Sequence, residues 1–227
     1  MEVAEVFRDK SKKKEVVINN LAPHWPFRAI YCGRSGSGKT NALLSMVSTH
    51  IPWQVIAVYA RHLDNAQYRG LREKIEKWEE KHDKVVSVWS DKLEDLQSVN
   101  DVEPTQRKLI VIDDFLLERD QSRVVEYFVS GRHKNCSIIY VSQAYFRIPK
   151  TIRDNATHLA CFRGMNGFDR SGIWKDACAT MRKEQFEDFY NAATKDDKYG
   201  FIFVDRDAKL PELQYRIGYD ELYIPLD

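Results

Sequence analysis

The chain has 227 residues, of which 43% are hydrophobic, and its 35 Lys and Arg residues are balanced by 34 Asp and Glu residues to a net charge of +1. This length suits one sizeable α/β domain, and the near-neutral charge excludes a globally basic nucleic-acid-binding protein, so any DNA contact must come from a local patch. No apolar run approaches the ~20 residues of a membrane span and no cleavable signal peptide is recognisable, so we expect a soluble, intracellular protein without a membrane-spanning segment.

The first fourteen residues end in Lys10-Ser11-Lys12-Lys13-Lys14 and carry few apolar side chains. This composition predicts a mobile basic arm over 1–14, ahead of a single domain over 15–227. The three consecutive lysines are a candidate DNA contact, and a solubilising tail or a capsid contact would have the same composition.

The first predicted strand, 27–32, leads directly into GRSGSGKT at 33–40, and a helix is predicted over 39–48. The spacing G-x-x-x-x-G-K-[ST] predicts a phosphate-binding loop, because glycines let backbone N–H groups converge and the helix N-terminus adds positive charge. Lys39 would reach the β- and γ-phosphates of ATP, and the Thr40 hydroxyl would bind the accompanying Mg²⁺. The residues expected at the nucleotide are Gly33, Arg34, Ser35, Gly36, Ser37, Gly38, Lys39, Thr40 and Asn41.

A second strand is predicted over 54–60, followed by a helix over 65–82 and a strand over 84–89. The connecting segment 61–72 mixes Arg, Tyr and Asn, which is a composition suited to gripping DNA phosphates. The same residues would equally form an ordinary solvated helix face.

The fourth predicted strand, 108–113, consists of apolar residues that end in Asp113 and Asp114, and a helix is predicted over 119–131. A buried strand with a carboxylate at its C-terminal end is typical of the catalytic edge of an α/β sheet. Asp113 therefore fits a Mg²⁺ carboxylate of a Walker B strand, and Asp114 fits the residue that polarises an attacking water. Two solvated acids capping a strand are the alternative.

A fifth strand is predicted over 136–142 and is followed by Gln143. The planar amide of Gln143 offers donors and an acceptor, so it could contact both the γ-phosphate and the attacking water. The alternative is a glutamine that simply starts the next loop.

Further strands are predicted over 158–163 and 200–205, a helix over 182–193, and one or two short edge strands within 213–226. The strands are continuously apolar, which indicates burial on both faces and hence a parallel sheet in a three-layer α/β domain. The cysteines are far apart and border apolar runs, so we expect reduced core residues at Cys32, Cys136, Cys161 and Cys178.

The order of phosphate-binding loop, paired acids and an extra strand ending in Gln143 resembles the additional-strand P-loop ATPases, a RecA-like fold with a mainly parallel sheet and a short C-terminal strand extension. More narrowly, residues 29–163 resemble the FtsK/HerA superfamily, in particular the genome-packaging ATPases of poxviruses, other large DNA viruses, virophages and Polinton-type elements. The segment Gly131-Arg132-His133 before the Gln143 strand carries part of this resemblance. Many relatives have Glu where this chain has Asp114, so it is open whether the shorter side chain reaches the water directly.

The resemblance implies an ATP-hydrolysing homo-oligomeric ring, a pentamer or hexamer, that drives double-stranded DNA into a preformed capsid. Its place would be the host cytoplasm or virus factory, with association with the virion also open. Apart from Arg34, no arginine is obvious near the phosphate-binding loop, so a neighbouring subunit is expected to supply one in trans. Arg132 is the first candidate and Arg163 the second.

Two other classes share the phosphate-binding loop. A small-molecule kinase would need an acceptor pocket and an arginine-rich lid, and would not need water activation by Asp114. A nucleotide-dependent switch or scaffold would bind without fast turnover. A GTPase is disfavoured, because Thr194-Lys195-Asp196-Asp197 lacks the Asn of a guanine-reading N-K-x-D segment.

Overall fold

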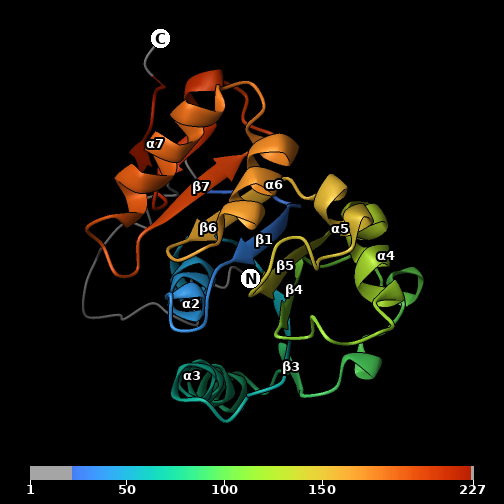
Figure 1. Cartoon of the computed structure of the whole chain (residues 1–227). Coiled ribbons are helices and arrows are strands. Elements are labelled where there is room, and N and C mark those ends of the chain that lie inside the picture. The colour runs from blue at the N-terminus through green and yellow to red at the C-terminus, as the bar shows by residue number, and fades with distance from the viewer. Residues whose placement is uncertain (1–21, 226–227) are drawn as a thin grey trace.

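The fold is built on one central sheet with strand order β3-β2-β4-β5-β1-β6-β7-β8-β9 (Figure 1). It is seen in a computed structural model that describes residues 22–225, so the predicted arm over 1–14 lies outside the described residues. The strands are β1 (Arg28–Cys32), β2 (Val55–Ala60), β3 (Ser87–Ser90), β4 (Lys108–Asp113), β5 (Cys136–Ser142), β6 (His158–Phe162), β7 (Phe201–Asp205), β8 (Tyr215–Ile217) and β9 (Glu221–Leu222).

The sheet is mainly parallel, as predicted. Strands β1 to β6 pair in parallel, whereas β7, β8 and β9 form an antiparallel extension at one edge. β5 lies between β1 and β4, with Ile30 opposite Tyr140 on one side and Val111 opposite Ile139 on the other. The additional-strand arrangement expected from the sequence is therefore confirmed.

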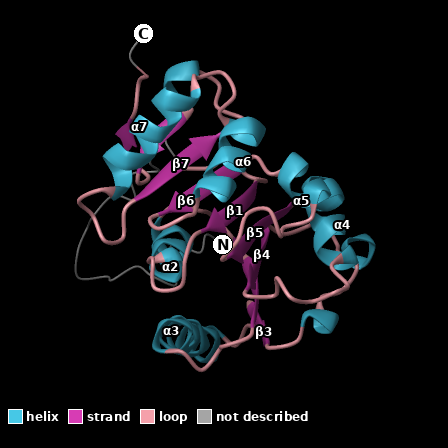
Figure 2. Cartoon of the chain, in the orientation of Figure 1, coloured by secondary structure: helices cyan, strands magenta, loops and turns pink. Residues whose placement is uncertain are grey.

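Helices cover both faces of the sheet, which gives the three layers (Figures 1 and 2). α2 and α3 pack on one face and α4 to α7 on the other. Alternate residues of each strand serve the two faces, so in β1 Ile30 packs toward α4–α7 whereas Tyr31 packs toward α2 and α3. The helices are α2 (Lys39–Thr49), α3 (Ala66–His82), α4 (Ser122–Ser130), α5 (Lys150–Asn155), α6 (Gly167–Ala177) and α7 (Lys183–Thr194), with 3₁₀ turns η1 (Leu93–Asp95), η2 (Val99–Asp101), η3 (Gly131–Lys134) and η4 (Pro211–Leu213).

The sequence pattern missed α5 and α6 and placed some boundaries wrongly. The strand predicted over 84–89 lies at Ser87–Ser90, and the helix predicted over 119–131 begins at Ser122 and ends at Ser130. Gly172 disturbs the helical pattern of α6, yet it is buried because the Phe146 ring lies 2.5 Å from where a Cβ would stand. The contact with Phe146 therefore explains why this position of the helix has a glycine, a residue that is unfavourable within helices.

Two further expectations from composition can be compared with the structure. Cys32, Cys136, Cys161 and Cys178 are all free and buried, as predicted. Within residues 22–225, no helix is both long and apolar enough to cross a bilayer.

A buried ion pair joins β8 to β7 within the antiparallel extension, and His158 of β6 contacts the same carboxylate. Arg216 in β8 is 2% exposed and donates from Nη2 to Asp205 Oδ2 at the end of β7, at 3.1 Å. Burial disfavours ionisation of Asp205, but the His158 ring 3.2 Å away and the Arg216 guanidinium outweigh it and hold the pKa of Asp205 below its ordinary value. The extension therefore depends on the charge of Asp205.

We expect Asp205→Asn to lower the free energy of unfolding by about 3 kcal/mol at neutral pH, because it removes the buried carboxylate that pairs with Arg216. Because the pKa of Asp205 is lower in the folded protein than in the unfolded chain, where it is about 3.9, its charge stabilises the fold above that pH. This stabilisation is lost as the pH falls through the folded-state pKa, so the difference in stability between wild type and Asp205→Asn should shrink below about pH 4. Urea unfolding across pH measures this.

The control is Glu76→Gln, which removes one half of the exposed Arg72–Glu76 pair and should cost about 0.5 kcal/mol or less. The double variant Asp205→Asn/Arg216→Met should lose less than the sum of the single changes. Additive losses would contradict the assignment of this pair as the coupling interaction.

Candidate functional site

The candidate site is a cleft of about 370 Å³ at the edge of the sheet where the parallel strands end. Lys39, Asp113, Asp114 and Gln143 all follow the C-terminal ends of β1, β4 or β5, which is where α/β sheets place ligands. The cleft is lined by Ser35, Gly36, Gly38, Lys39, Thr40, Asn41, Ala60, Arg61, His62, Asn65, Gln67, Tyr68, Asp113, Asp114, Val141, Ser142, Gln143 and Tyr199.

The phosphate-binding loop is held by close backbone packing. The backbone N–H of Gly33 donates to the Ser142 carbonyl at 3.2 Å, and a Cβ on Gly33 would lie 2.6 Å from the Cβ of Phe162 in β6. Only glycine fits this position without moving β1 or β6. The loop therefore leaves the sheet along a path fixed by its neighbours on both sides.

The loop ends in an uncapped helix N-terminus. Gly38 has φ 94° and precedes α2 without any side-chain cap hydrogen bond, so the first N–H groups of the helix are free for an anion. The Ser37 hydroxyl is buried and has no hydrogen-bond partner. These donors match the oxygens of a polyphosphate.

Lys39 is folded back on the loop that precedes it. Its Nζ donates to the carbonyls of Gly33 at 2.7 Å and Arg34 at 2.9 Å, and the side chain is buried. Burial lowers the pKa of Lys39, while the charge of Asp113 opposes that shift. The ammonium group is therefore positioned before any phosphate arrives.

Asp113 is a largely buried carboxylate whose position is fixed by α3. The Tyr68 hydroxyl donates to Asp113 Oδ2 at 2.7 Å, and Asn65 caps the same helix by accepting from the Tyr68 backbone N–H. Burial raises the pKa of Asp113, although the hydrogen bond from Tyr68 and the Lys39 charge oppose this. A bound divalent cation would relieve that desolvation.

Asp114 and Gln143 contact each other across the same cleft. Gln143 Nε2 donates to Asp114 Oδ1 at 3.3 Å, and His62 Nε2 lies 3.9 Å from Asp114 Oδ2. Asp114 has φ 65°. This backbone conformation is uncommon for residues other than glycine and clusters at functional sites. The structure therefore brings together the two side chains proposed to act on water.

The two candidate arginines lie at opposite ends of the sheet. Arg132 is in η3, before the N-terminal end of β5, whereas Gln143 follows the C-terminal end of that seven-residue strand. At ~3.3 Å per residue the strand separates them by roughly 20 Å, so Arg132 does not reach the cleft of its own chain. Arg163 follows β6 at the nucleotide edge, where its N–H donates to Gly200.

Several side chains of the cleft were not singled out as site residues from the sequence. Tyr199 is half exposed and lies over Gly38, with its Cβ 3.2 Å from the position of a Cβ there. Tyr68 and Asn65 were considered only as part of a DNA-binding segment, but they serve Asp113 and the helix cap. Within that segment Arg61 pairs with Glu118 and Arg72 with Glu76. The sequence motif of a phosphate-binding loop does not predict which distant residues, such as Tyr199, pack against the loop.

Residues 13–184 match the sequence family described as the poxvirus A32 protein. The chain belongs to this family. Relatives include the DNA packaging protein OPG160 of variola virus, 28% identical over 162 residues, and that of vaccinia virus strain Copenhagen, 27% identical over 167 residues. These matches cover 66% and 69% of this chain, and in both cases 58% of the relative, so the chain matches under two thirds of the relatives' length.

Solved structures of the genome packaging NTPase B204 from Sulfolobus turreted icosahedral virus 2 have a similar fold. The complex with AMPPCP has a TM-score of 0.58 at 14% identity, over 85% of this chain and 97% of that chain. The complex with ATP-gammaS has a TM-score of 0.57 at 15% identity, over 85% and 96%. The family and the fold agree with the expectations from the sequence.

The close packing of Gly33 gives a test of the loop. We expect Gly33→Ala to destabilise the protein by about 1–3 kcal/mol through overpacking against Phe162 and to lose nucleotide binding, because the loop is displaced from β6. Thermal unfolding and titration with a fluorescent ATP analogue measure both effects. Ser35→Ala, which keeps every backbone donor of the loop, is the control, and equal behaviour of the two variants would contradict the prediction.

Proposed function

We propose that this chain is an ATP-hydrolysing motor that moves double-stranded DNA, most specifically a viral genome into a preformed capsid. The observation that carries the hydrolytic part is the hydrogen bond between Asp114 and Gln143 over the cleft that also holds Lys39 and Asp113. Two adjacent polar side chains that could orient a water molecule favour hydrolysis over phosphoryl transfer to a small-molecule acceptor.

The chain's own groups divide the work of binding ATP. The backbone of 33–38 and the first turn of α2 hold the phosphate oxygens, and Lys39 exchanges the carbonyls of Gly33 and Arg34 for the β- and γ-phosphates. Thr40 and the half-buried Asp113 would hold Mg²⁺, which would neutralise charge developing on the phosphates. Two protein ligands suffice, because Mg²⁺ in nucleotide sites takes its other ligands from phosphates and water.

Asp114 and Gln143 would orient the attacking water. The aspartate is one methylene shorter than glutamate, and the Gln143 amide that donates to it would supply a second polar group for the same water. Asp114 accepts the water's proton and Gln143 holds the water in line. The pair therefore compensates for the shorter acid.

The DNA-packaging part of the proposal is supported by the names of the relatives, which are DNA packaging proteins in poxviruses, and by the shared fold of a genome packaging NTPase. Double-stranded DNA and a capsid component are the proposed partners, with action in the host cytoplasm, the virus factory or the virion. A ring of five or six copies is proposed because Arg132 lies too far from its own cleft and could stabilise charge only in a neighbour's.

We expect Lys39→Ala to lower DNA-stimulated phosphate release from ATP by roughly 100-fold or more, because the positive charge at the transferred phosphate is lost. Lys175→Ala, which removes an exposed lysine of α6, is the matched control and should retain wild-type turnover. Circular dichroism of both variants checks the fold. A Lys39→Ala protein that hydrolyses ATP at the wild-type rate would refute the ATPase proposal.

Substitutions of Asp113 and Asp114 should have different effects, because the two acids are proposed to have different roles. Asp113→Asn is expected to weaken Mg²⁺-dependent ATP binding, because the charge that holds the cation is gone, whereas Asp114→Asn should bind MgATP normally and lose about 10²–10⁴-fold in turnover. Both changes keep an oxygen for the hydrogen bonds from Tyr68 and Gln143, so each is the structural control for the other. Isothermal titration and phosphate release measure the two effects, and equal MgATP binding with retained hydrolysis in both variants would show the assignment to be wrong.

A further inference from the structure

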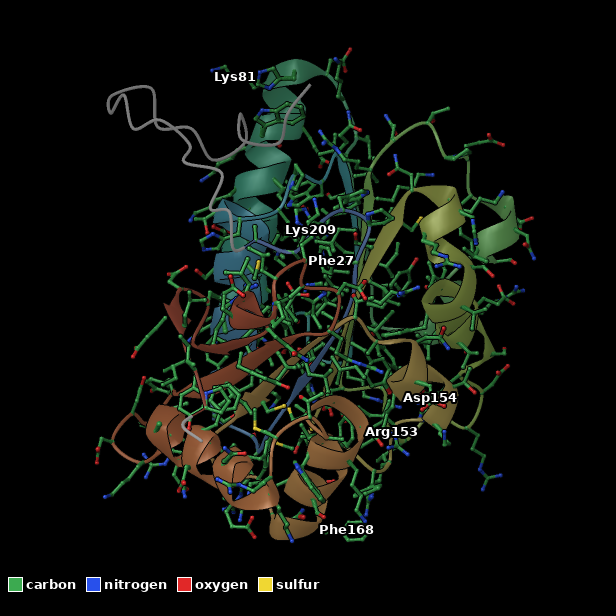
Figure 3. The ribbon with its side chains drawn as sticks, turned by 90° about the horizontal axis from the view of Figure 1, so that it is seen from above. Phe27, Lys81, Arg153, Asp154, Phe168 and Lys209 are labelled. Atoms are coloured by element: carbon green, nitrogen blue, oxygen red, sulfur yellow. The ribbon has the colours of Figure 1, made fainter. Side chains whose placement is uncertain are left out.

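Three arginines surround a second pocket at the end of the sheet opposite the nucleotide cleft. The pocket has a volume of about 240 Å³, and Arg28 begins β1, Arg132 lies in η3 and Arg206 follows β7. Asp154 of α5, which is labelled in Figure 3, also lines this pocket. The pocket is lined by Arg28, Val129, Arg132, Asp154, Asn155, Ala156, Thr157, Arg206 and Asp207.

The two carboxylates that line the pocket, Asp154 and Asp207, form no close ion pair with its three arginines. Among residues 22–225, no carboxylate lies within 4.0 Å of the guanidinium of Arg28, Arg132 or Arg206 to form an ion pair, and Asp154 is held by Lys150 at 2.6 Å. The Arg28 Nε is buried without a hydrogen-bond partner. A buried guanidinium donor without a partner is costly, so the cluster has the character of an incomplete anion site.

The electrostatics of Arg28 agree with this. Burial lowers the pKa of its guanidinium; Asp207 opposes that shift, and the like charges of Arg132 and Arg206 add to it. The pocket and the Lys150 that pairs with Asp154 together contribute four positive charges and two negative ones, the latter on Asp154 and Asp207. An anion placed between the arginines would offset their mutual repulsion.

The pocket is also preorganised. Arg206 Nη1 donates to the carbonyls of Ala156 at 2.7 Å and Arg153 at 3.1 Å, and its backbone N–H donates to Thr157 at 2.8 Å. The Arg28 backbone N–H is fixed by the Thr157 hydroxyl at 2.9 Å. The Arg206 guanidinium and the backbone of Arg28 are therefore held in place before any ligand binds, whereas Arg132 is exposed and donates from Nε to His133 Nε2 at 3.3 Å.

We propose that this pocket binds a phosphate group through Arg28, Arg132 and Arg206. Planar guanidinium groups bind phosphate oxygens in pairs, and the volume equals that of about eight waters, which accommodates a phosphate with part of its hydration. Resting on the proposed function, the phosphate comes from the DNA backbone or from the ATP of a neighbouring copy. Arg132 is then the exposed member of a three-arginine site.

The first experiment uses inorganic sulfate as the probe, with the phosphate-binding loop saturated with the Mg²⁺ complex of ATPγS. Sulfate should raise the wild-type melting temperature by about 3 °C more than that of Arg28→Gln/Arg132→Gln. Arg123→Gln on α4, which loses one positive charge as Arg132→Gln alone does, is the control for the general stabilisation by sulfate. Arg132→Gln alone is measured as well, because it changes an exposed side chain and should reduce the shift even if the double variant folds poorly.

An equal sulfate shift in wild type, Arg132→Gln and Arg123→Gln would overturn the proposal. This readout needs neither DNA nor hydrolysis, so it fails or succeeds independently of the proposed motor function. If wild type shows the sulfate shift but neither binds DNA nor hydrolyses ATP, the pocket stands and the motor function falls.

The second experiment distinguishes the two sources of phosphate. If the DNA backbone supplies it, the double variant should bind a fluorescent DNA duplex about 10-fold more weakly at 150 mM salt, with the salt slope reduced by about 1. If a neighbour's ATP supplies it, DNA affinity should match that of Arg123→Gln while hydrolysis at saturating DNA falls more than 10-fold. Variants that equal Arg123→Gln in both measurements would remove both the DNA backbone and a neighbour's ATP as sources of the phosphate.

Discussion

The nucleotide edge depends on the insertion of β5 between β1 and β4. Adjacent strands lie ~4.8 Å apart, so the inserted strand sets the ends of β1 and β4 about 10 Å from each other. That gap separates Lys39 from Asp113 and leaves room for a phosphate chain and its cation. Because β5 ends at Ser142, the same insertion places Gln143 between the two, within hydrogen-bond distance of Asp114. One topological choice therefore sets the spacing of every group in the cleft.

The charges of the cleft are arranged at a cost to the folded protein. Lys39 is held by two carbonyls and Asp113 by one tyrosine hydroxyl, and burial disfavours the charged form of each. Groups of this kind are stabilised most when a ligand of opposite charge arrives. The binding of a magnesium nucleotide would thus satisfy both at once, which links occupancy of the site to the stability of the edge.

The two ends of the sheet have complementary chemistry. One end holds the cleft with Asp113 and Asp114, and the other holds three arginines without ion-pair partners among the described residues. The strands between them keep these sites roughly 20 Å apart, so one chain cannot bring Arg28, Arg132 and Arg206 to its own cleft. In a closed ring, such an arrangement lets one copy contribute to the site of the next.

Much of the site was determined by the sequence alone. The glycine spacing predicted a phosphate-binding loop over 33–40, and the apolar runs before Asp113 and Gln143 predicted the strands that end beside them, because spacing and hydrophobic pattern are local properties of the sequence. Only the tertiary structure decided which other residues join them. Tyr68 contacts Asp113 across 45 positions, Tyr199 lies over Gly38, Gly172 packs against the Phe146 ring, and Arg28, Arg132 and Arg206 line one pocket. Such contacts arise from sheet order and helix packing, which bring distant segments together and leave no periodic signal in the sequence.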